Sequence, residues 1–208
     1  MATRAKSGQD TMNLILASGS LARSQMLQAS GISFGVEKAF IDEESVKEAL
    51  LAESATAHEI ADILAEIKAL AVSAINPRVY ILGADQVLSL DGNCLSKAKN
   101  ITEAKQNLQA LSDKKHSLIS AAVIAFDGQV IWRAIDKATL KMRPLSDDFI
   151  DSYLDKCGEE ILSSVGCYHL EGLGAQLFES VEGDYFTVLG MPLLKVLHFC
   201  RTQGIIMS

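Results

Sequence analysis

Apolar residues recur at strand and helix spacings in the first third of the chain. Residues 14–17 form a short apolar strand that leads through a polar turn into a helix. Gly31 suits the end of that helix, because glycine adopts the left-handed conformation without steric cost. Between residues 58 and 75 the apolar positions return every three or four residues, so this segment is predicted to be a helix with one face in the core. Lys68 rises from that helix.

The middle of the chain has the pattern of two β-hairpins with a helix between them. Asp91-Gly92 and Asp127-Gly128 are two-residue turn signals, and β-rich runs flank each of them. The expected elements are, in order, strand 79–90, strand 93–97, helix 102–111, strand 117–126 and strand 130–142.

The last third of the chain is expected to begin and end with a helix. Ser146 can cap the first of these helices, and Gly158 follows its end. Strands are expected at 175–181 and 185–189, and Pro192 then opens the final helix, where its missing N–H costs nothing. Mixed strands and helices with several antiparallel hairpins predict an α/β fold of the mixed α+β kind.

The composition is that of a globular protein. Of the 208 residues 49% are hydrophobic and 22% are charged, so the chain can bury a core and is not disordered. The net charge of −7 argues against broad binding to nucleic-acid polymers or membrane surfaces, while a local cationic pocket for a small anion stays compatible with it. No apolar run approaches the roughly 20 residues that cross a bilayer.

The chain terminus and the cysteines bear on organisation and compartment. Residues 1–12 are polar and show no signal peptide, so we expect a flexible arm before a single domain at 13–208. The four cysteines form no CxxC pair and the four histidines are scattered. This pattern favours reduced thiols in the cytoplasm over a zinc site.

The first candidate for chemistry is the turn from Ser18 to Arg23. A strand that turns through small hydroxyl residues into a helix presents free backbone N–H groups and a positive dipole end to an anion. Arg23 can grip phosphate oxygens with its planar guanidinium. The alternative is that Ser20 only caps the helix.

The second candidate is Asp85, which an apolar strand delivers at or near its end. A buried strand rarely accepts a charge without a partner or a metal, so Asp85 could bind a divalent cation or take a proton from water. Pairing across the following hairpin would bring Lys97 to the same end of the sheet, where it could bind phosphate. A turn-capping aspartate and a solvated lysine are the alternatives.

A glycine-rich segment near residue 170 is the third candidate. Gly166, Gly172 and Gly174 allow a ligand to approach the backbone closely, and Glu171 lies between them. A tight turn without a ligand is the alternative reading.

Five segments in this order resemble the Maf family of nucleotide pyrophosphatases. They are LILASGSLARSQML, LAEIKA, GADQVLSLDG, LSKA and GCYHLEGLGAQLFESVEGDYFTVLGMPL, and the likeness extends from residue 13 to residue 204. The resemblance implies a Maf/ITPase-like two-lobed fold with a mixed sheet and a central cleft, often as a homodimer. It also implies hydrolysis of a nucleoside triphosphate to its monophosphate and pyrophosphate, with Mg²⁺ or Mn²⁺.

The resemblance also assigns roles to individual residues. The phosphate-binding residues would be Ser18, Ser20, Arg23 and Lys68. The catalytic residues would be Asp85, Lys97 and Glu43. Glu43 and Asp85 would hold the metal, and Asp85 matches the proposed proton acceptor of the family.

Three positions depart from the family pattern, which usually has Pro and two Arg after the second serine and Lys-Pro after the hairpin. Here Leu21 and Ala98 replace the prolines, which costs loop rigidity, and Ala22 replaces the first Arg. Ala22, Gln86 and Glu171 match the substrate-selecting positions. Gln86 and Glu171 resemble the residues found there in members that act on 7-methyl-GTP. The carboxylate of Glu171 could accept hydrogen bonds from N1–H and N2–H of guanine. The sequence therefore favours a guanine-type substrate.

Two other functions are compatible with a nucleotide site of this kind. One is a nucleotide-binding regulator of cell division, or septation, without significant turnover. The other is a nucleotidyltransferase that forms a phosphoanhydride with a second substrate. The combination of Glu43, Lys68, Asp85 and Lys97 favours the hydrolase, because a sensor does not need a carboxylate that activates water.

Overall fold

The centre of the structure is a seven-stranded mixed sheet. The computed structural model describes residues 13–207, so the expected arm at 1–12 lies outside the described residues. The strand order is β2-β1-β3-β5-β6-β7, and β4 pairs with β3. β1 is parallel to β2 and β3, whereas the other pairs are antiparallel. The strands are β1 (Leu14–Leu16), β2 (Gly35–Val36), β3 (Tyr80–Leu90), β4 (Asn93–Leu95), β5 (Lys115–Phe126), β6 (Gln129–Met142) and β7 (Phe178–Glu182).

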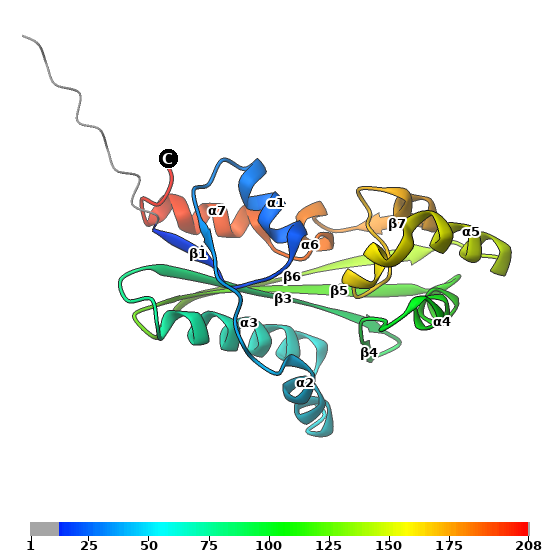
Figure 1. Ribbon diagram of the computed structural model, residues 1–208, viewed down its shortest axis with the longest axis horizontal. Helices are drawn as coiled ribbons and strands as arrows, with labels where there is room; N and C mark the ends of the chain where they lie inside the picture. The colour runs from blue at the N-terminus through cyan, green and yellow to red at the C-terminus, as the bar shows by residue number, and fades with distance from the viewer. Residues whose placement is uncertain (1–12, 208) are drawn as a thin grey trace, which may run out of the picture.

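Helices cover both faces of this sheet, which confirms the predicted α/β class. Figure 1 shows α1 and α7 on one face and α3 on the other, and separate apolar clusters fill the two interfaces. The α-helices are α1 (Leu21–Ala29), α2 (Glu43–Ala52), α3 (Ala57–Ser73), α4 (Ile101–Leu111), α5 (Asp147–Cys157), α6 (Tyr185–Val188) and α7 (Leu193–Thr202). The sequence pattern predicts the others at least approximately, but it does not predict α2 or α6.

Side chains alternate across β3, which decides what each of its residues can contact. Val87 packs in the cluster formed with α3, and Gly83 lies on the same side of the strand. A Cβ at Gly83 would come within 2.1 Å of the Ala65 carbonyl oxygen, so the missing side chain allows α3 to lie directly against β3. Asp85 shares this face, whereas Gln86 points to the opposite one.

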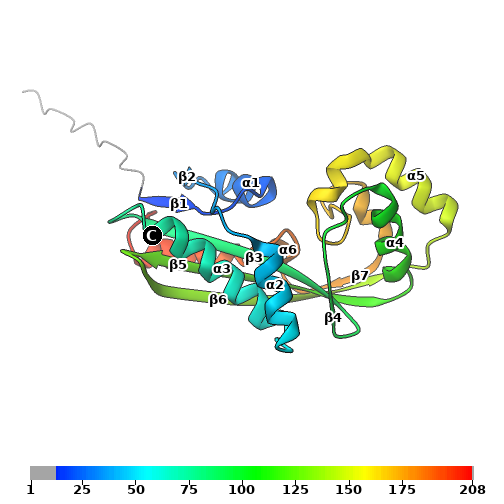
Figure 2. The same ribbon diagram turned by 60° about the horizontal axis from the view of Figure 1, so that its bottom comes forward.

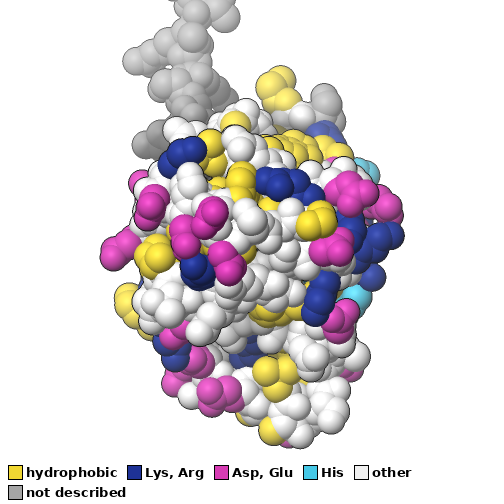
Figure 3. Space-filling model, turned by 90° about the vertical axis from the view of Figure 1, so that its right-hand side faces the viewer, with side chains coloured by type: hydrophobic (Ala, Val, Ile, Leu, Met, Phe, Trp, Pro, Cys, Tyr) yellow, Lys and Arg dark blue, Asp and Glu magenta, His cyan; other side chains and the backbone are white. Residues whose placement is uncertain are grey.

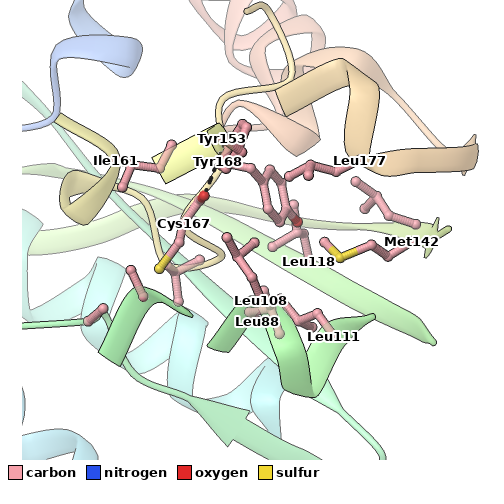
Figure 4. Packing of buried hydrophobic residues seen from close by; sticks show 14 of the residues in the cluster. Leu88, Leu108, Leu111, Leu118, Met142, Tyr153, Ile161, Cys167, Tyr168 and Leu177 are labelled. Atoms are coloured by element: carbon pink, nitrogen blue, oxygen red, sulfur yellow. Dashed lines mark hydrogen bonds between the residues drawn. The ribbon is translucent and has the colours of Figure 1, made fainter. Parts of the chain in front are cut away.

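A further apolar cluster lies at the other end of the sheet, beside α4 and α5. Figure 4 shows Tyr153, Cys167 and Tyr168 among its side chains. His116 is buried against the rings of Tyr168 and Phe178, and its Nε2 lies 2.7 Å from the Tyr168 hydroxyl. Figure 2 shows α4 and α5 gathered far from α1 along the sheet. The division of the domain into two lobes stays a prediction.

The strand expected at 185–189 is wrong, because this segment begins with the short helix α6. Oδ1 of Asp184 accepts hydrogen bonds from the backbone N–H groups of Phe186, at 2.8 Å, and Thr187, at 3.2 Å. These bonds satisfy the free donors of the first helical turn. The apolar residues of this segment suit a strand as well as a helix, so the Asp184 cap favours the helix.

The strands expected at 175–181 and 93–97 are only partly correct. A 3₁₀ helix occupies Leu173–Leu177, and the strand begins after it, at Phe178. β4 ends at Leu95, so Lys97 lies in the loop after the hairpin and not on the strand.

The surface of the described residues bears on two kinds of larger partner, membranes and nucleic acids. Within residues 13–207, no helix is long and apolar enough to cross a membrane. Figure 3 views the end that carries α4 and α5, and it shows basic and acidic side chains interspersed over that face. The expectation that no nucleic-acid polymer is bound stays a prediction.

Candidate active site

The candidate site lies at a gap in the pairing along one edge of β3. β1 pairs with residues 80–82 of β3, and β4 pairs with residues 88–90, so residues 83–87 have a strand partner only on the β5 side. β1 is parallel to β3 and β4 is antiparallel to it, so both strands run toward the gap. Their following loops, which carry Ser18 and Lys97, therefore converge on Asp85 from opposite sides.

Asp85 lies in the middle of β3, and not at or near its end as predicted. Its backbone pairs with Ala121 of β5, and this pairing continues to Ser89, so the strand does not stop at the charged residue. The Asp85 side chain is only 11% exposed. Oδ1 accepts a 2.7 Å hydrogen bond from Nζ of Lys68. A buried strand tolerates the carboxylate because α3 supplies this cation.

The ammonium group of Lys68 joins two carboxylates. Besides the 2.7 Å contact with Asp85, its Nζ lies 2.6 Å from Oε2 of Glu43. Lys68 is 5% exposed and rises from the face of α3 that packs on the sheet. The predicted association of Glu43, Lys68 and Asp85 is therefore present, although the roles assigned to them stay predictions.

Helix α2 distinguishes between the two neighbouring acidic residues at its start. Asp42 is the N-cap: its side chain accepts from the backbone N–H of Ser45 at 3.1 Å and from the Ser45 hydroxyl at 2.8 Å. These hydrogen bonds lower the pKa of Asp42. Glu43 is the first helical residue and is free to reach Lys68. The cap thus leaves Glu43 as the carboxylate at the site.

The turn after β1 holds Arg23 in a fixed orientation. Arg23 donates from Nε to the Gly190 carbonyl at 2.9 Å and from Nη1 to Oγ of Ser18 at 3.0 Å. Ser20 is the N-cap of α1, and its hydroxyl accepts from the Arg23 backbone N–H at 3.4 Å. The predicted capping role of Ser20 is confirmed; a phosphate contact from this residue stays a prediction.

Burial lowers the pKa of Arg23, while the nearby charges of Asp85 and Glu43 raise it. Arg23 is a buried residue, so its positive charge is poorly screened by water and acts strongly on the two nearby carboxylates. The charges of the cluster also act on Lys97. Burial lowers its pKa most, the positive charges of Arg23 and Lys68 lower it further, and Glu43 and Asp85 raise it. Lys97 therefore shares the site with the residues that the sequence grouped with it.

A pocket of about 370 Å³ opens beside this cluster. Ala22 and Glu171, two of the three positions expected to select the substrate, both line it. The rings of Tyr185 and Phe186 line it as well, together with apolar residues of α1 and α7. The pocket is thus an aromatic and apolar chamber with one carboxylate, which suits a planar heterocycle.

Gln86 does not line this pocket; it contacts the pocket wall from behind. Its Nε2 lies 2.9 Å from the carbonyl oxygen of Thr187, 3.0 Å from that of Val188 and 3.1 Å from the Ser120 hydroxyl. The carboxamide therefore anchors α6, the helix that presents Tyr185. The N–H groups of Gln86 can thus affect selectivity through α6, because they hold the helix that carries Tyr185.

The donor set at the gap fits a hard divalent cation that a substrate helps to bind. Among residues 13–207, no group of three or more Asp, Glu, His or Cys side chains is placed to hold a metal. Glu43 and Asp85 each use one oxygen for Lys68, and the second oxygen of each has no hydrogen-bond partner within this range. Mg²⁺ commonly takes one or two protein carboxylates, with waters and substrate phosphates as its other ligands.

Sequence reasoning missed two contributors to the site. The Gly190 carbonyl orients Arg23, but a backbone oxygen carries no signal in a sequence. The sequence pattern predicts a strand for Tyr185 and Phe186, whereas the structure has them at the start of α6, where both line the pocket. The available signal was Asp184, a residue type favoured at a helix N-cap.

The fold and the site define an α/β protein with buried cations and a carboxylate pair beside an apolar chamber, an arrangement suited to a ligand that combines phosphates with a planar base. The chain matches the model of the family described as Maf-like protein over residues 13–203, and it belongs to that family.

Several curated proteins are similar over almost their full length. A nucleoside triphosphate pyrophosphatase of Paramagnetospirillum magneticum is 48% identical, with 91% of this chain and 98% of that protein covered. One of Caulobacter vibrioides is 47% identical, with 91% and 94% covered. A 7-methyl-GTP pyrophosphatase of Brucella abortus is 44% identical, with 93% and 97% covered.

Proposed function

We propose that this protein hydrolyses a nucleoside triphosphate to its monophosphate and pyrophosphate, with a guanine-type base as the preferred substrate. The observation that carries the proposal is the ammonium of Lys68 between Glu43 and Asp85, in a gap flanked by Arg23 and Lys97. Membership of the Maf family and the names of the similar proteins support the same reaction.

The cations of the site match the charge of the substrate. A nucleoside triphosphate carries about four negative charges at neutral pH, and buried cations stabilise it more strongly than cations in water do. Arg23 and Ser18 approach from the β1 side, and Lys97 approaches from the β4 side. The triphosphate would lie across the gap with the nucleobase in the pocket beside α1 and α6.

In the proposed reaction Asp85 accepts the proton of the attacking water. The water oxygen forms a bond to the α-phosphorus, the bond from that phosphorus to the bridging oxygen breaks, and pyrophosphate leaves. The contact with Lys68 keeps the Asp85 carboxylate oriented and leaves its second oxygen available. Charge that develops on the phosphate oxygens would be stabilised by Lys97 and Arg23.

We assign the divalent cation, Mg²⁺ or Mn²⁺, to Glu43 and Asp85. When bound, it would supply a positive charge to phosphate oxygens and lower the pKa of a water molecule. The free oxygens of the two carboxylates support this assignment. The free oxygen of Asp85 has two lone pairs, so one can hold the cation and the other can accept the proton of the water.

The pocket supports the guanine-type substrate. Glu171 places a carboxylate at its wall, which can accept two N–H groups from a guanine edge and would repel the carbonyl groups of uracil. Ala22 offers no ring for stacking, but Tyr185 and Phe186, which also line the pocket, have aromatic rings that can stack on a base. The name of the Brucella abortus relative agrees with a methylated guanine, and removal of modified nucleotides would follow from such selectivity.

The test is pyrophosphate release from GTP, 7-methyl-GTP, dTTP, UTP and CTP with Mg²⁺ or Mn²⁺. We expect turnover of the guanine nucleotides to exceed that of the pyrimidine nucleotides. Glu171→Gln should reduce this preference by about 10- to 100-fold, because the amide replaces one acceptor with a donor. Comparable hydrolysis of UTP by the wild type, together with no effect of Glu171→Gln, would discard the substrate proposal and keep the reaction.

The same panel tests the rival functions. Nucleotide binding without turnover would favour the regulator of septation over the enzyme. Formation of a phosphoanhydride only with a second substrate would favour a nucleotidyltransferase. We further propose a cytoplasmic location, which the four free cysteines support, and a homodimer, which sedimentation of the purified protein would test.

A further inference from the structure

Helix α2 carries Glu43 but is weakly packed. None of its residues is buried, and only Val46 and Leu50 pack against the apolar cluster of α3 and the sheet. An element with so few buried contacts has low local stability unless polar contacts hold it. The position of the Glu43 carboxylate therefore depends on what fixes α2.

Lys47 provides such a contact between α2 and the loop that carries Lys97. Its Nζ donates to the Leu95 carbonyl at 2.9 Å and to the Ser96 hydroxyl at 3.2 Å. Lys47 lies four residues after Glu43, so both side chains leave the same face of the helix. Leu95 ends β4, and Ser96 directly precedes Lys97.

A second contact holds the same loop from the other side. Nδ2 of Asn107, on α4, donates to the Ser96 carbonyl at 3.3 Å. The loop is thus fixed between α2 and α4. An ion pair between Glu44 and Lys99 also links α2 to this region. The side chain of Glu44 is 66% exposed and that of Lys99 is 71% exposed, so solvent screens their attraction and the pair does little to hold α2 in place.

We propose that Lys47 is a positioning residue for hydrolysis: it holds the Lys97 loop and the Glu43 helix in register, on either side of Asp85. This role rests on the proposed function. The ammonium of Lys47 already donates to the Leu95 carbonyl and the Ser96 hydroxyl, so Lys47 acts on the reaction by holding this loop and not by contacting substrate. A displacement of about 1 Å in a catalytic group can cost on the order of 100-fold in rate.

The primary test is Lys47→Met, which keeps the length of the side chain and removes the donor. We expect kcat to fall about tenfold, with a change in KM of less than about twofold, since the loss concerns the placement of catalytic groups. Lys47→Arg, which can donate to both acceptors, should restore most of the rate. Lys99→Met makes the same charge change in the exposed pair and should stay within about twofold of the wild type.

A double variant distinguishes positioning from direct phosphate binding. Because Lys47 acts partly through Lys97, adding Lys47→Met to Lys97→Met should reduce kcat by only about two- to threefold further, instead of the tenfold that Lys47→Met costs alone; the remaining loss acts through Glu43. Independent, multiplying losses would overturn the proposal and indicate direct contact with substrate. An unchanged kcat in Lys47→Met, or a loss that parallels a lowered fraction of folded protein by circular dichroism, would overturn it too. Failure of the wild type to release pyrophosphate would instead refute the proposed function.

Discussion

At the residue scale, the ammonium group of Lys68 balances two carboxylates that would otherwise repel each other at the gap in the sheet. It lies 2.6 Å from Glu43 and 2.7 Å from Asp85, in a position shielded from solvent. A lysine that holds two carboxylates in this way also limits how they rotate. One oxygen of Glu43 and one of Asp85 stay free of this contact and are available to the proposed substrate and cation.

Replacing Asp85 tests its proposed role as base. Asp85→Asn keeps the size of the side chain and an acceptor for Lys68, so we expect normal folding by circular dichroism. The rate of pyrophosphate release should fall by roughly 10²–10⁴, the range for loss of a general base. Glu43→Gln is the matched control, since it neutralises the other carboxylate: its loss should be partly recovered at higher Mg²⁺, unlike that of Asp85→Asn. Near-wild-type turnover in Asp85→Asn would remove the residue from the base role.

The lowered pKa of Lys97 predicts an alkaline limit on activity. Its ammonium loses the proton as pH rises through a pKa below the ordinary 10.5, because burial disfavours the charged form. A neutral amine binds phosphate poorly, so kcat/KM, which reports the free enzyme, should decline at pH values below 10.5. In Lys97→Arg the guanidinium stays protonated, and the decline should move to higher pH. Identical profiles of the two proteins would assign the alkaline limit to another group.

At the element scale, the contact of α3 with β3 sets where Lys68 and Asp85 meet. Gly83 makes this contact possible: a Cβ there would lie 2.1 Å from the Ala65 carbonyl oxygen and 2.7 Å from the Ala69 nitrogen. Both of these atoms belong to the backbone of α3, so a rotamer change cannot relieve the overlap.

Gly83→Ala should therefore displace α3 and destabilise the protein by about 1–3 kcal/mol, the usual cost of overpacking. Chemical denaturation followed by circular dichroism measures this change. Turnover per folded molecule should fall as well, since Lys68 moves with the helix. The control is Gly172→Ala, where the nearest atom to the new Cβ is the His169 oxygen at 3.8 Å. Equal stability of the two variants would contradict the close contact.

At the scale of the whole molecule, the buried His116 couples stability to pH. Burial lowers its pKa from 6.5 to about 4, and Nδ1 has no hydrogen-bond partner among the described residues. Between these pH values the unfolded chain binds a proton that the folded protein does not. The free energy of unfolding therefore rises with pH across this window and falls as the solution is acidified.

This linkage should be visible in unfolding experiments between pH 6.5 and pH 5. Over that interval the histidine should lower the free energy of unfolding of the wild type by about 1.5 kcal/mol. His116→Gln, which still offers Tyr168 a hydrogen bond, should lack this contribution. The exposed His198→Gln is the matched control and should follow the wild type. Parallel curves for His116→Gln and the wild type would show that the histidine is not the source of the pH dependence.

Local sequence signals predicted much of the fold but less of the site. The strand before Ser18, the long helix with Lys68 and the hairpin turns followed from periodicity and turn residues, since these depend on near neighbours in the chain. Helix α6 did not follow, because its four residues depend on the Asp184 cap and on Gln86, which reaches it from a distant strand. Helix α2 buries none of its residues, so it left no core face to detect.

The sequence by itself determined the order of most elements, the family and the charged residues that were grouped as a candidate site. Tertiary structure decided how they meet: the interruption of strand pairing beside Asp85, the contact of Glu43 with Lys68, and the contact of Lys47 with the Lys97 loop. These outcomes depend on elements distant in the chain that pack against one another. Such packing fixes which buried charges become neighbours, and no local periodicity encodes it.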